Sequence, residues 1–264
     1  MQLMIGFTLS LLVGYAAFRF NALTRSGTAA AVFLGGLIFG LGGLPWASLL
    51  LIFFISSSLL SIAFRGRKQA VSEKFSKGAR RDSGQVLANG GLALILVLIQ
   101  WFFPQLVEPW IAFAGCMAAV NADTWATELG VLNPSPPRLI TNGKVVSRGT
   151  SGGVTWTGYL AALTGAALIA LAGAYFTQAA AYNVPWVILG GLVGATVDSI
   201  LGATVQGIYY CPECGKETES YPKHHCGTRT TQIRGWHWLN NDLINLFCSL
   251  IGAAVALGGW FLFT

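Results

Sequence analysis

Eight long apolar runs alternate with short polar connections along this chain of 264 residues. A helix needs about 20 residues to cross the hydrocarbon core of a membrane, and each run approaches that length. The expected spans are Leu3–Phe20, Thr28–Leu44, Trp46–Phe64, Asn89–Phe103, Pro109–Gly130, Trp156–Phe176, Pro185–Gly207 and Leu239–Phe263. The second and fourth runs are short, so one of them is expected to tilt or to re-enter the membrane. The first lacks the basic start of a signal peptide and is expected to be an anchor.

The composition supports a membrane protein. Hydrophobic residues make up 54% of the chain and charged residues only 10%, whereas soluble domains average about 25% charged residues. We therefore predict an all-α, polytopic integral membrane bundle of about eight spans. Residues 1–264 are expected to form a single membrane domain, with residues 208–234 as a small zinc-knuckle-like insertion between the last two spans.

The basic residues indicate the orientation of the chain. All 16 lysines and arginines fall in alternate connections or at their edges: Arg19, Arg25, Arg65, Arg67, Lys68, Lys74, Lys77, Arg80, Arg81, Arg138, Lys144, Arg148, Lys216, Lys223, Arg229 and Arg234. The positive-inside rule then predicts that both termini lie outside and that the large loops are cytoplasmic. This distribution explains the net charge of +6 without a nucleic-acid partner, for which there is no recognition domain.

Four acidic residues lie within the spans or at their cytoplasmic ends, namely Asp123, Glu128, Asp198 and Asp242. Acids inside a membrane are costly and usually mark a functional site. Amides and hydroxyls are expected at a similar depth: Asn89, Asn121, Thr124, Thr127, Ser199, Gln206, Asn240, Asn241 and Asn245. Three interpretations remain open: hydrogen bonds between helices, an ion-coupled carrier, and a site for metal and phosphate. The last accounts best for both carboxylates and amides, because Mg²⁺ prefers oxygen ligands.

A glycine-rich stretch with basic residues precedes the sixth span, from Lys144 through Arg148 to Gly153. Backbone N–H groups at the start of a helix favour anions, and lysine and arginine side chains add charge-assisted hydrogen bonds to phosphate. Small residues at such positions also allow close helix packing. The chain has no GxxxxGK[ST] motif, so it is not a P-loop enzyme.

The loop 65–88 is the most basic segment of the chain. Its first part, Arg65–Lys77, is expected to attract anionic lipid headgroups. Arg81, Gln85 and Asn89 follow at intervals of four residues. That spacing predicts one helical face pointing into the site.

A cysteine cluster lies between the last two spans. Cys211 and Cys214 form a CxxC pair, and His224-His225-Cys226 follows. This spacing is typical of a small structural zinc site, and cytoplasmic thiols stay reduced rather than forming disulfides. We expect Cys211, Cys214 and Cys226 to bind zinc together with His224, which we prefer to His225.

Five motifs follow in order along the chain: QVLANG at 85–90, NADTWATE at 121–128, GTSGGVT at 149–155, GATVDSILGA at 194–203 and NNDLIN at 240–245. This series resembles the membrane family that includes transmembrane protein 19 and phytyl phosphate kinase. A fainter similarity, through Asp123-Thr124 and Gly149–Gly153, runs to CTP-using membrane enzymes such as phosphatidate cytidylyltransferase.

The resemblance implies an enzyme that transfers a phosphoryl group from a nucleoside triphosphate, with CTP favoured, to an isoprenyl monophosphate such as phytyl, geranylgeranyl or farnesyl phosphate. Phosphoryl transfer depends mainly on positioning and charge neutralisation. Mg²⁺ is then expected at Asp123, Asp198 and Asp242, with Glu128 as a further ligand or supporting group.

Basic and polar residues of the motifs have matching expected roles. Lys144 and Arg148 would bind the triphosphate, and Arg81 and Asn89 would orient a phosphate. The remaining expected binding residues are Gln85, Asn121, Thr124, Thr150, Gly152, Gly153, Ser199, Asn241 and Asn245. A lipid cytidylyltransferase and an ion-coupled transporter remain the alternatives. The lipid chain, the nucleotide, the number of metal ions and the oligomeric state are open at this stage.

Overall fold

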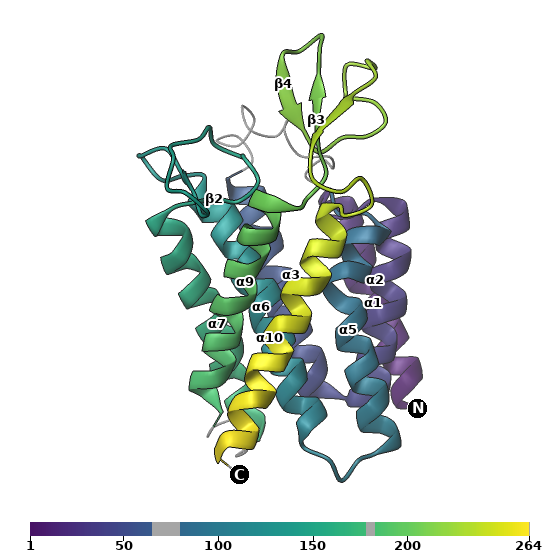
Figure 1. Ribbon diagram of the computed structural model, residues 1–264. Coiled ribbons are helices and arrows are strands. Elements are labelled where there is room, and N and C mark those ends of the chain that lie inside the picture. The colour runs from purple at the N-terminus through teal and green to yellow at the C-terminus, as the bar shows by residue number, and fades with distance from the viewer. Residues whose placement is uncertain (65–79, 178–182, 264) are drawn as a thin grey trace.

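The computed structural model describes residues 1–64, 80–177 and 183–263, most of them in long helices that run side by side (Figure 1). The basic segment Arg65–Lys77, expected to attract headgroups, lies outside the described residues. The helices are α1 (Gln2–Arg19), α2 (Arg25–Leu37) with the π-helical turn η1 (Ile38–Gly42), α3 (Leu44–Ala63), α5 (Ser83–Phe102), α6 (Glu108–Gly130), α7 (Trp156–Phe176), α9 (Val184–Thr204) and α10 (Asn241–Phe263).

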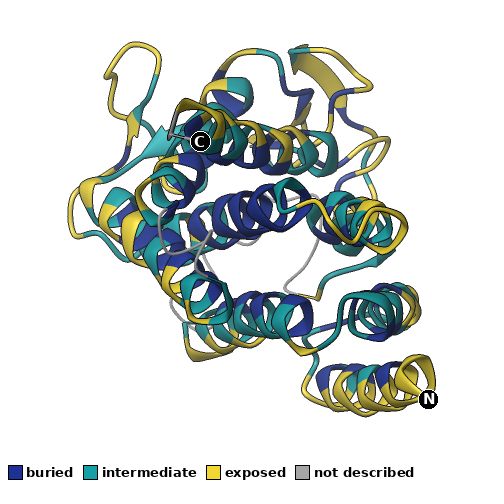
Figure 2. Cartoon of the chain, turned by 90° about the horizontal axis from the view of Figure 1, so that it is seen from below, coloured by how far each residue is buried: buried dark blue, intermediate teal, exposed yellow. Residues whose placement is uncertain are grey.

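The helices confirm the expected membrane bundle. Seven of them, counting η1 as part of α2, are long and apolar enough to cross a membrane. The other, α6, carries three acidic residues, yet residues 109–122 are all buried. It contacts α3, α5, α7, α9 and α10, so protein rather than lipid surrounds it. Figure 2 accordingly shows the buried residues concentrated inside the bundle and the exposed residues around its outside.

The two short spans are longer than expected. The second continues through η1 to Gly42, and α5 begins at Ser83 rather than at Asn89. A capping box starts α5: the Gln85 backbone N–H donates to the Asp82 side chain, and the Asp82 N–H donates to the Gln85 side chain. Both segments therefore reach spanning length, and neither needs to re-enter the membrane.

The helices start differently at the two ends of the bundle. At the end that carries the small sheets, the side chains of Thr24, Asp82, Thr155 and Asn240 accept hydrogen bonds from the first turns of α2, α5, α7 and α10. At the other end, α3, α6 and α9 each have a proline in the first turn. Both devices satisfy or remove N–H groups that have no partner within the helix. Both chain termini lie at the proline end (Figure 1).

Two small sheets, which the sequence did not predict, cover the capped end. Strands β1 (Arg138–Leu139) and β2 (Gly153–Val154) pair antiparallel. Strands β3 (Ile208–Cys211), β4 (Lys216–Thr218) and β5 (Thr231–Arg234) form an antiparallel sheet in the order β4-β3-β5. With two to four residues each, these strands are too short for their alternation to be recognised in the sequence.

Glycines bring three central helices into close contact. A Cβ atom added at Gly252 of α10 would lie 2.6 Å from the Gly115 carbonyl oxygen and 2.4 Å from the Ala119 Cβ of α6. One added at Gly190 of α9 would lie 2.6 Å from the Gly252 oxygen. Small residues allow such backbone contact between membrane helices. This glycine seam, formed by Gly115, Gly190, Gly194 and Gly252, fixes the relative rotation of α6, α9 and α10.

We expect the Gly252→Ala protein to be less stable than the wild type by about 1–3 kcal/mol, because the added methyl group overlaps backbone atoms that cannot move independently. The thermal unfolding midpoint of the detergent-solubilised protein measures the effect. Gly258→Ala is the matched control on the same helix, since no described atom beyond its chain neighbours and the backbone of its own helix lies within 4 Å of its added Cβ. Equal unfolding midpoints for Gly252→Ala and Gly258→Ala would show that the close contact at Gly252 does not stabilise the bundle.

Candidate functional site

The glycine seam places Asp123 and Asp198 together. A Cβ added at Gly194 would lie 2.7 Å from the Ala119 Cβ and 2.8 Å from the Cys248 carbonyl oxygen. Asp123 follows Ala119 by four residues, and Asp198 follows Gly194 by four. Residues four apart lie one above the other on a helix. The two carboxylates therefore stand on facing sides of α6 and α9, one turn nearer the sheets.

The Asp198 carboxylate is buried without a counter-charge described beside it. Its Oδ2 atom is inaccessible to solvent and has no hydrogen-bond partner among the described residues. The negative charges of Asp123 and Glu219 both act on it. Like charges held together in a low-dielectric environment repel strongly. A divalent cation would remove that repulsion, and its oxygen ligands would be these carboxylates.

Helix α10 contributes amides rather than Asp242 to the same face. Asn245 and Asn241 are three and seven residues before Cys248, which packs against Ala119. At about 100° per residue, both point to roughly the side that Cys248 occupies, whereas Asp242 lies about 120° away around the helix. Asp242 stands in the first turn of α10, with its Oδ1 atom buried.

Glu128 belongs to a second polar cluster, on the other side of α6. Its Oε1 atom accepts a hydrogen bond of 2.7 Å from Ser61 of α3. The Arg81 guanidinium lies 5.4 Å from the centre of the Phe53 ring. Burial lowers the pKa of Arg81, and the Glu128 charge opposes that change. Glu128 thus places a negative charge near the half-buried Arg81, between α3, α5 and α6.

The expected helical face through Arg81, Gln85 and Asn89 does not form. Arg81 precedes α5 and pairs through its backbone with Leu23, in the connection between α1 and α2. Gln85 caps α5, as described above. Asn89 is half-buried on α5, as are Thr124 on α6 and Ser199 on α9.

Asn121 ties three helices together. Its Nδ2 donates to the Gly165 carbonyl oxygen of α7 at 2.8 Å, and its Oδ1 accepts from Ser56 of α3 at 3.2 Å. Trp125 also donates to Ser56. Asn121 is fully buried, and these bonds satisfy it through helix packing.

The glycine-rich turn lies against the end of α9 and not at the start of α7. Thr155 caps α7, so Gly149–Gly153 precedes the helix. Gly149 and Gly152 have φ of +78° and +79°, a conformation that glycine adopts easily. A Cβ atom at Gly152 would lie 2.4 Å from the Ala203 Cβ. Any side chain at position 152 would therefore clash with α9, so the close packing is by itself sufficient to require glycine there.

The basic residues of this loop lie at its surface. Lys144 and Arg148 are both exposed. The Arg148 Nη2 atom donates to the Asn133 and Pro134 carbonyl oxygens at 2.6 and 2.9 Å. A phosphate bound by Arg148 would have to replace these contacts.

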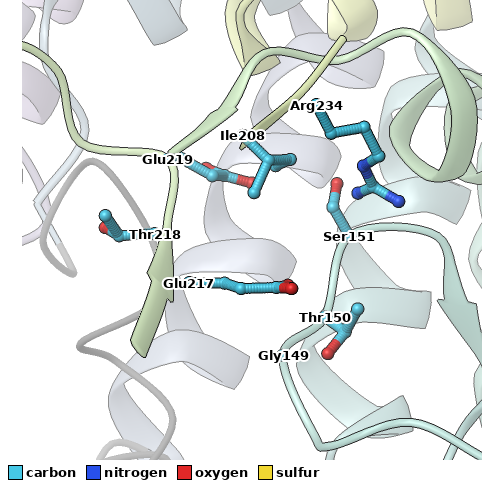
Figure 3. A pocket seen from close by; sticks show the side chains of 8 residues that line it. All are labelled: Gly149, Thr150, Ser151, Ile208, Glu217, Thr218, Glu219 and Arg234. Atoms are coloured by element: carbon cyan, nitrogen blue, oxygen red, sulfur yellow. The ribbon is translucent and has the colours of Figure 1, made fainter. Parts of the chain in front are cut away.

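A shallow, open pocket separates the glycine-rich turn from the three-stranded sheet (Figure 3). Its lining residues are Gly149, Thr150, Ser151, Ile208, Glu217, Thr218, Glu219 and Arg234. Thr150 was an expected site residue, but the members from the sheet were missed. Glu217 and Glu219 alternate with Thr218, which in an extended segment puts both acids on one face. In the sequence, these two acids lie between Cys214 and His224, and the spacing of the cysteines and histidines indicated only a metal group.

The sheet carries a group of four residues that can hold a metal ion: Cys211, Cys214, His224 and Cys226. Their ligand atoms all lie within 4.8 Å of one another. The Cys211 and Cys226 sulfurs are 3.5 Å apart, and His224 Nδ1 lies 3.4 Å from Cys214 Sγ and 3.3 Å from Cys226 Sγ. Tetrahedral zinc with Zn–S bonds of about 2.3 Å separates sulfurs by roughly 3.7 Å, so the group fits such an ion. His224 is the converging histidine, as expected.

The protonation of this group is uneven. Hydrogen bonds from Thr228 and His224 lower the pKa of Cys226 to about 6. The hydrogen bond with Cys226, followed by burial, raises the pKa of Cys214 to about 12. Cys226 therefore loses its proton more easily than Cys214, and metal binding would displace the thiol protons that remain.

Comparison with known proteins agrees with the membrane architecture. Residues 8–253 match the family described as integral membrane protein DUF92. Protein PGR of Arabidopsis thaliana is 34% identical over 274 residues, covering 95% of this chain and 93% of that protein. An uncharacterized membrane protein of Methanocaldococcus jannaschii is 33% identical over 183 residues, covering 69% of this chain and 74% of that protein.

A more distant relative is Protein VTE6, chloroplastic, of Arabidopsis thaliana. It is 24% identical over 243 residues, which cover 90% of this chain and 65% of that protein. No solved structure matches the chain significantly. The family match covers nearly the whole bundle and the sheet, and the chain therefore belongs to the integral membrane protein DUF92 family.

Proposed function

We propose that this protein is a Mg²⁺-dependent kinase that transfers the terminal phosphoryl group of CTP, or of another nucleoside triphosphate, to an isoprenyl monophosphate. A phosphate oxygen of the lipid forms a bond to the terminal phosphorus while the bond to the nucleoside diphosphate breaks. The observation that carries the proposal is the juxtaposition of Asp123 and Asp198, with a buried Asp198 oxygen that has no hydrogen-bond partner among the described residues.

The chain's own residues would position and neutralise the phosphates. Asp123 and Asp198 would hold Mg²⁺, with Asp242 at the rim, and bound Mg²⁺ supplies charge neutralisation on the phosphate oxygens. Asn241 and Asn245 lie on the same side of α10 and can orient a phosphate. Lys144 and Arg148 would bind the triphosphate from the loop. The lipid monophosphate already carries an anionic oxygen, so the reaction needs no strong base.

The isoprenyl substrate is proposed from the resemblance of the five motifs to phytyl phosphate kinase. A lipid tail among the helices would leave its phosphate at the end where the acids lie, since Asp198 is only six residues from the end of α9. That distance along the axis is about 9 Å. The basic loops and the positive-inside rule favour a cytoplasmic position for this end, with both termini outside and structural zinc in the cytoplasmic sheet.

Product analysis tests the reaction. Purified protein in detergent is supplied with Mg²⁺, labelled CTP or ATP, and phytyl, geranylgeranyl or farnesyl monophosphate, beside the Asp123→Ala protein. We expect lipid diphosphate from the wild type and none from the variant. A CDP-lipid would instead establish a cytidylyltransferase. Absence of nucleotide turnover in folded protein would overturn the proposal in favour of a transporter.

Glu128 is expected to act mainly through stability. The Glu128→Gln protein should retain phosphoryl transfer within about tenfold, because Glu128 lies beside Arg81 and Ser61 and not beside Asp198. Its unfolding free energy should fall by about 1 kcal/mol, since Arg81 loses a nearby negative charge. Activity and thermal unfolding measure the two effects. The double variant Glu128→Gln/Arg81→Met should recover stability. Loss of activity as complete as that of Asp123→Ala would place Glu128 in the metal site.

A further inference from the structure

The exposed tryptophans of this protein lie at the ends of its membrane spans. Among the described residues, four tryptophans have more than half of their surface exposed, namely Trp101, Trp156, Trp236 and Trp238. Trp101 stands in the last turn of α5, and Trp156 is the first residue of α7. Exposed phenylalanines and leucines also occur in the middle of a span, as Phe33 of α2 does. This distribution is typical of tryptophans that lie at the membrane–water interface.

Two of these four residues, Trp236 and Trp238, lie outside the helices, in the turn between β5 and α10. The Trp236 N–H donates to the Val205 carbonyl oxygen at 2.8 Å, and the Gly207 N–H donates to the Leu239 carbonyl oxygen at 2.9 Å. Val205 directly follows the last residue of α9, and α10 begins two residues after Leu239. The turn is therefore held at the level where two spans end, as Figure 1 shows for the loop that enters α10.

The backbone of this turn is fixed, but its two indole rings are not covered. Leu239 is buried, and its N–H donates to the Trp236 carbonyl oxygen at 3.0 Å, which closes the turn. The Gln206 carbonyl oxygen lies so close to Gly235 that any side chain at position 235 would overlap it. Trp236 and Trp238 nevertheless remain 53% and 54% exposed. The turn thus presents both rings from an ordered backbone.

The two rings form one apolar surface. Their centroids are 5.5 Å apart and their planes are inclined by only 18°, so the stacked pair has no slot for a planar ligand between its rings. An indole combines a large apolar ring with one N–H donor, which suits a position that is apolar on one side and wet on the other. The same segment continues into α10, where Phe247 and Leu250 are exposed along the span. The surface of the pair therefore adjoins the lipid-facing side of the bundle.

We infer that Trp236 and Trp238 bind the headgroup region of the membrane that the helices cross, and that they hold the three-stranded sheet against the membrane surface. Strand β5 ends two residues before Trp236 and pairs with β3, which carries Cys211 of the Cys-His group. Anchoring the turn therefore limits the movement of this group above the bundle. The anchoring is independent of the proposed kinase reaction, because it involves neither the acidic pair nor a nucleotide.

Fluorescence quenching in a bilayer tests the position of the pair. The full-length protein is reconstituted into nanodiscs of phosphatidylcholine that carries bromine atoms, which quench indoles at close range, either near the headgroups or near the bilayer centre. The chain has nine tryptophans, so the emission of the Trp236→Phe/Trp238→Phe protein is subtracted from that of the wild type. Bromine near the headgroups should quench the difference emission about twofold or more strongly than bromine near the centre. Iodide in the aqueous phase should quench it little.

Trp156→Phe is the matched control, because Trp156 stands at the end of a span, and its difference emission should show the same dependence on depth. The single variants Trp236→Phe and Trp238→Phe give the result for each ring separately. Difference emission that iodide quenches, and that bromine at neither depth affects, would overturn the inference and leave the kinase proposal intact. Protection from iodide that appears only when CTP is added would also overturn it, because a nucleotide and not the membrane would then cover the rings.

Discussion

The Asp198→Asn protein is expected to lose phosphoryl transfer by about 10³-fold or more, while remaining folded and zinc-loaded. A catalytic metal contributes several kcal/mol to a phosphoryl transition state, and each 1.4 kcal/mol or so corresponds to a factor of ten in rate. The amide replaces a charged oxygen that is buried beside Asp123. It keeps the shape of the side chain, so the helix packing is preserved. Initial rates at saturating Mg²⁺, measured with the lipid monophosphate, give the effect directly.

The same substitution should make the protein more stable without Mg²⁺, because it relieves the repulsion between the two buried acids. Higher stability with lower activity is a combination that a purely structural role would not produce. Glu108→Gln is the control, since Glu108 is an acid in the first turn of α6, at the far end of the bundle. It should retain wild-type activity. Full activity in Asp198→Asn would remove Asp198 from the proposed metal site.

Loss of the metal group should unfold the three-stranded sheet. Cys214→Ser and His224→Ala are expected to abolish stoichiometric zinc binding, as measured by metal analysis of the purified proteins. The strands contain only three or four residues each, too few for a stable sheet on their own. Metal binding in small zinc modules supplies about 10 kcal/mol or more of folding free energy. Limited proteolysis should therefore cut residues 208–234 in the variants while the helices stay intact.

His225→Ala is the matched control for this experiment, because His225 is exposed next to the buried His224. It should keep its zinc and its resistance to proteolysis. Zinc loss in His225→Ala with retention in His224→Ala would reverse the assignment.

Local features made much of the architecture predictable. The number of spans follows from the lengths of the apolar runs, and the boundaries agree within a few residues for most helices. The main exception is α5, which begins at Ser83 because Asp82 and Gln85 form a capping box. The Cys-His ligands were also predictable, because CxxC and HxC place ligands on tight turns. In each case the decisive contacts lie within a few residues along the chain.

The grouping of the acids depended on tertiary contacts. The sequence predicted one site for Asp123, Glu128, Asp198 and Asp242. In the folded chain, Asp123 meets Asp198, while Glu128 faces Ser61 on the opposite side of α6. Five residues on a helix correspond to a rotation of about 140°. Only the close packing of α6, α9 and α10 at their glycines determines which of these faces meets which neighbour.

The sequence by itself determined that this is a helical membrane protein with polar chemistry at one end of the bundle and a Cys-His metal group between its last two spans. Composition, segment length and ligand spacing are local quantities that need no knowledge of the fold. The tertiary structure alone decided that Gly152 packs on α9, that Asp198 rather than Glu128 stands beside Asp123, and that Glu128 faces Ser61 of α3. These relations join residues that are distant in the chain, and helix rotation and backbone approach determine them together.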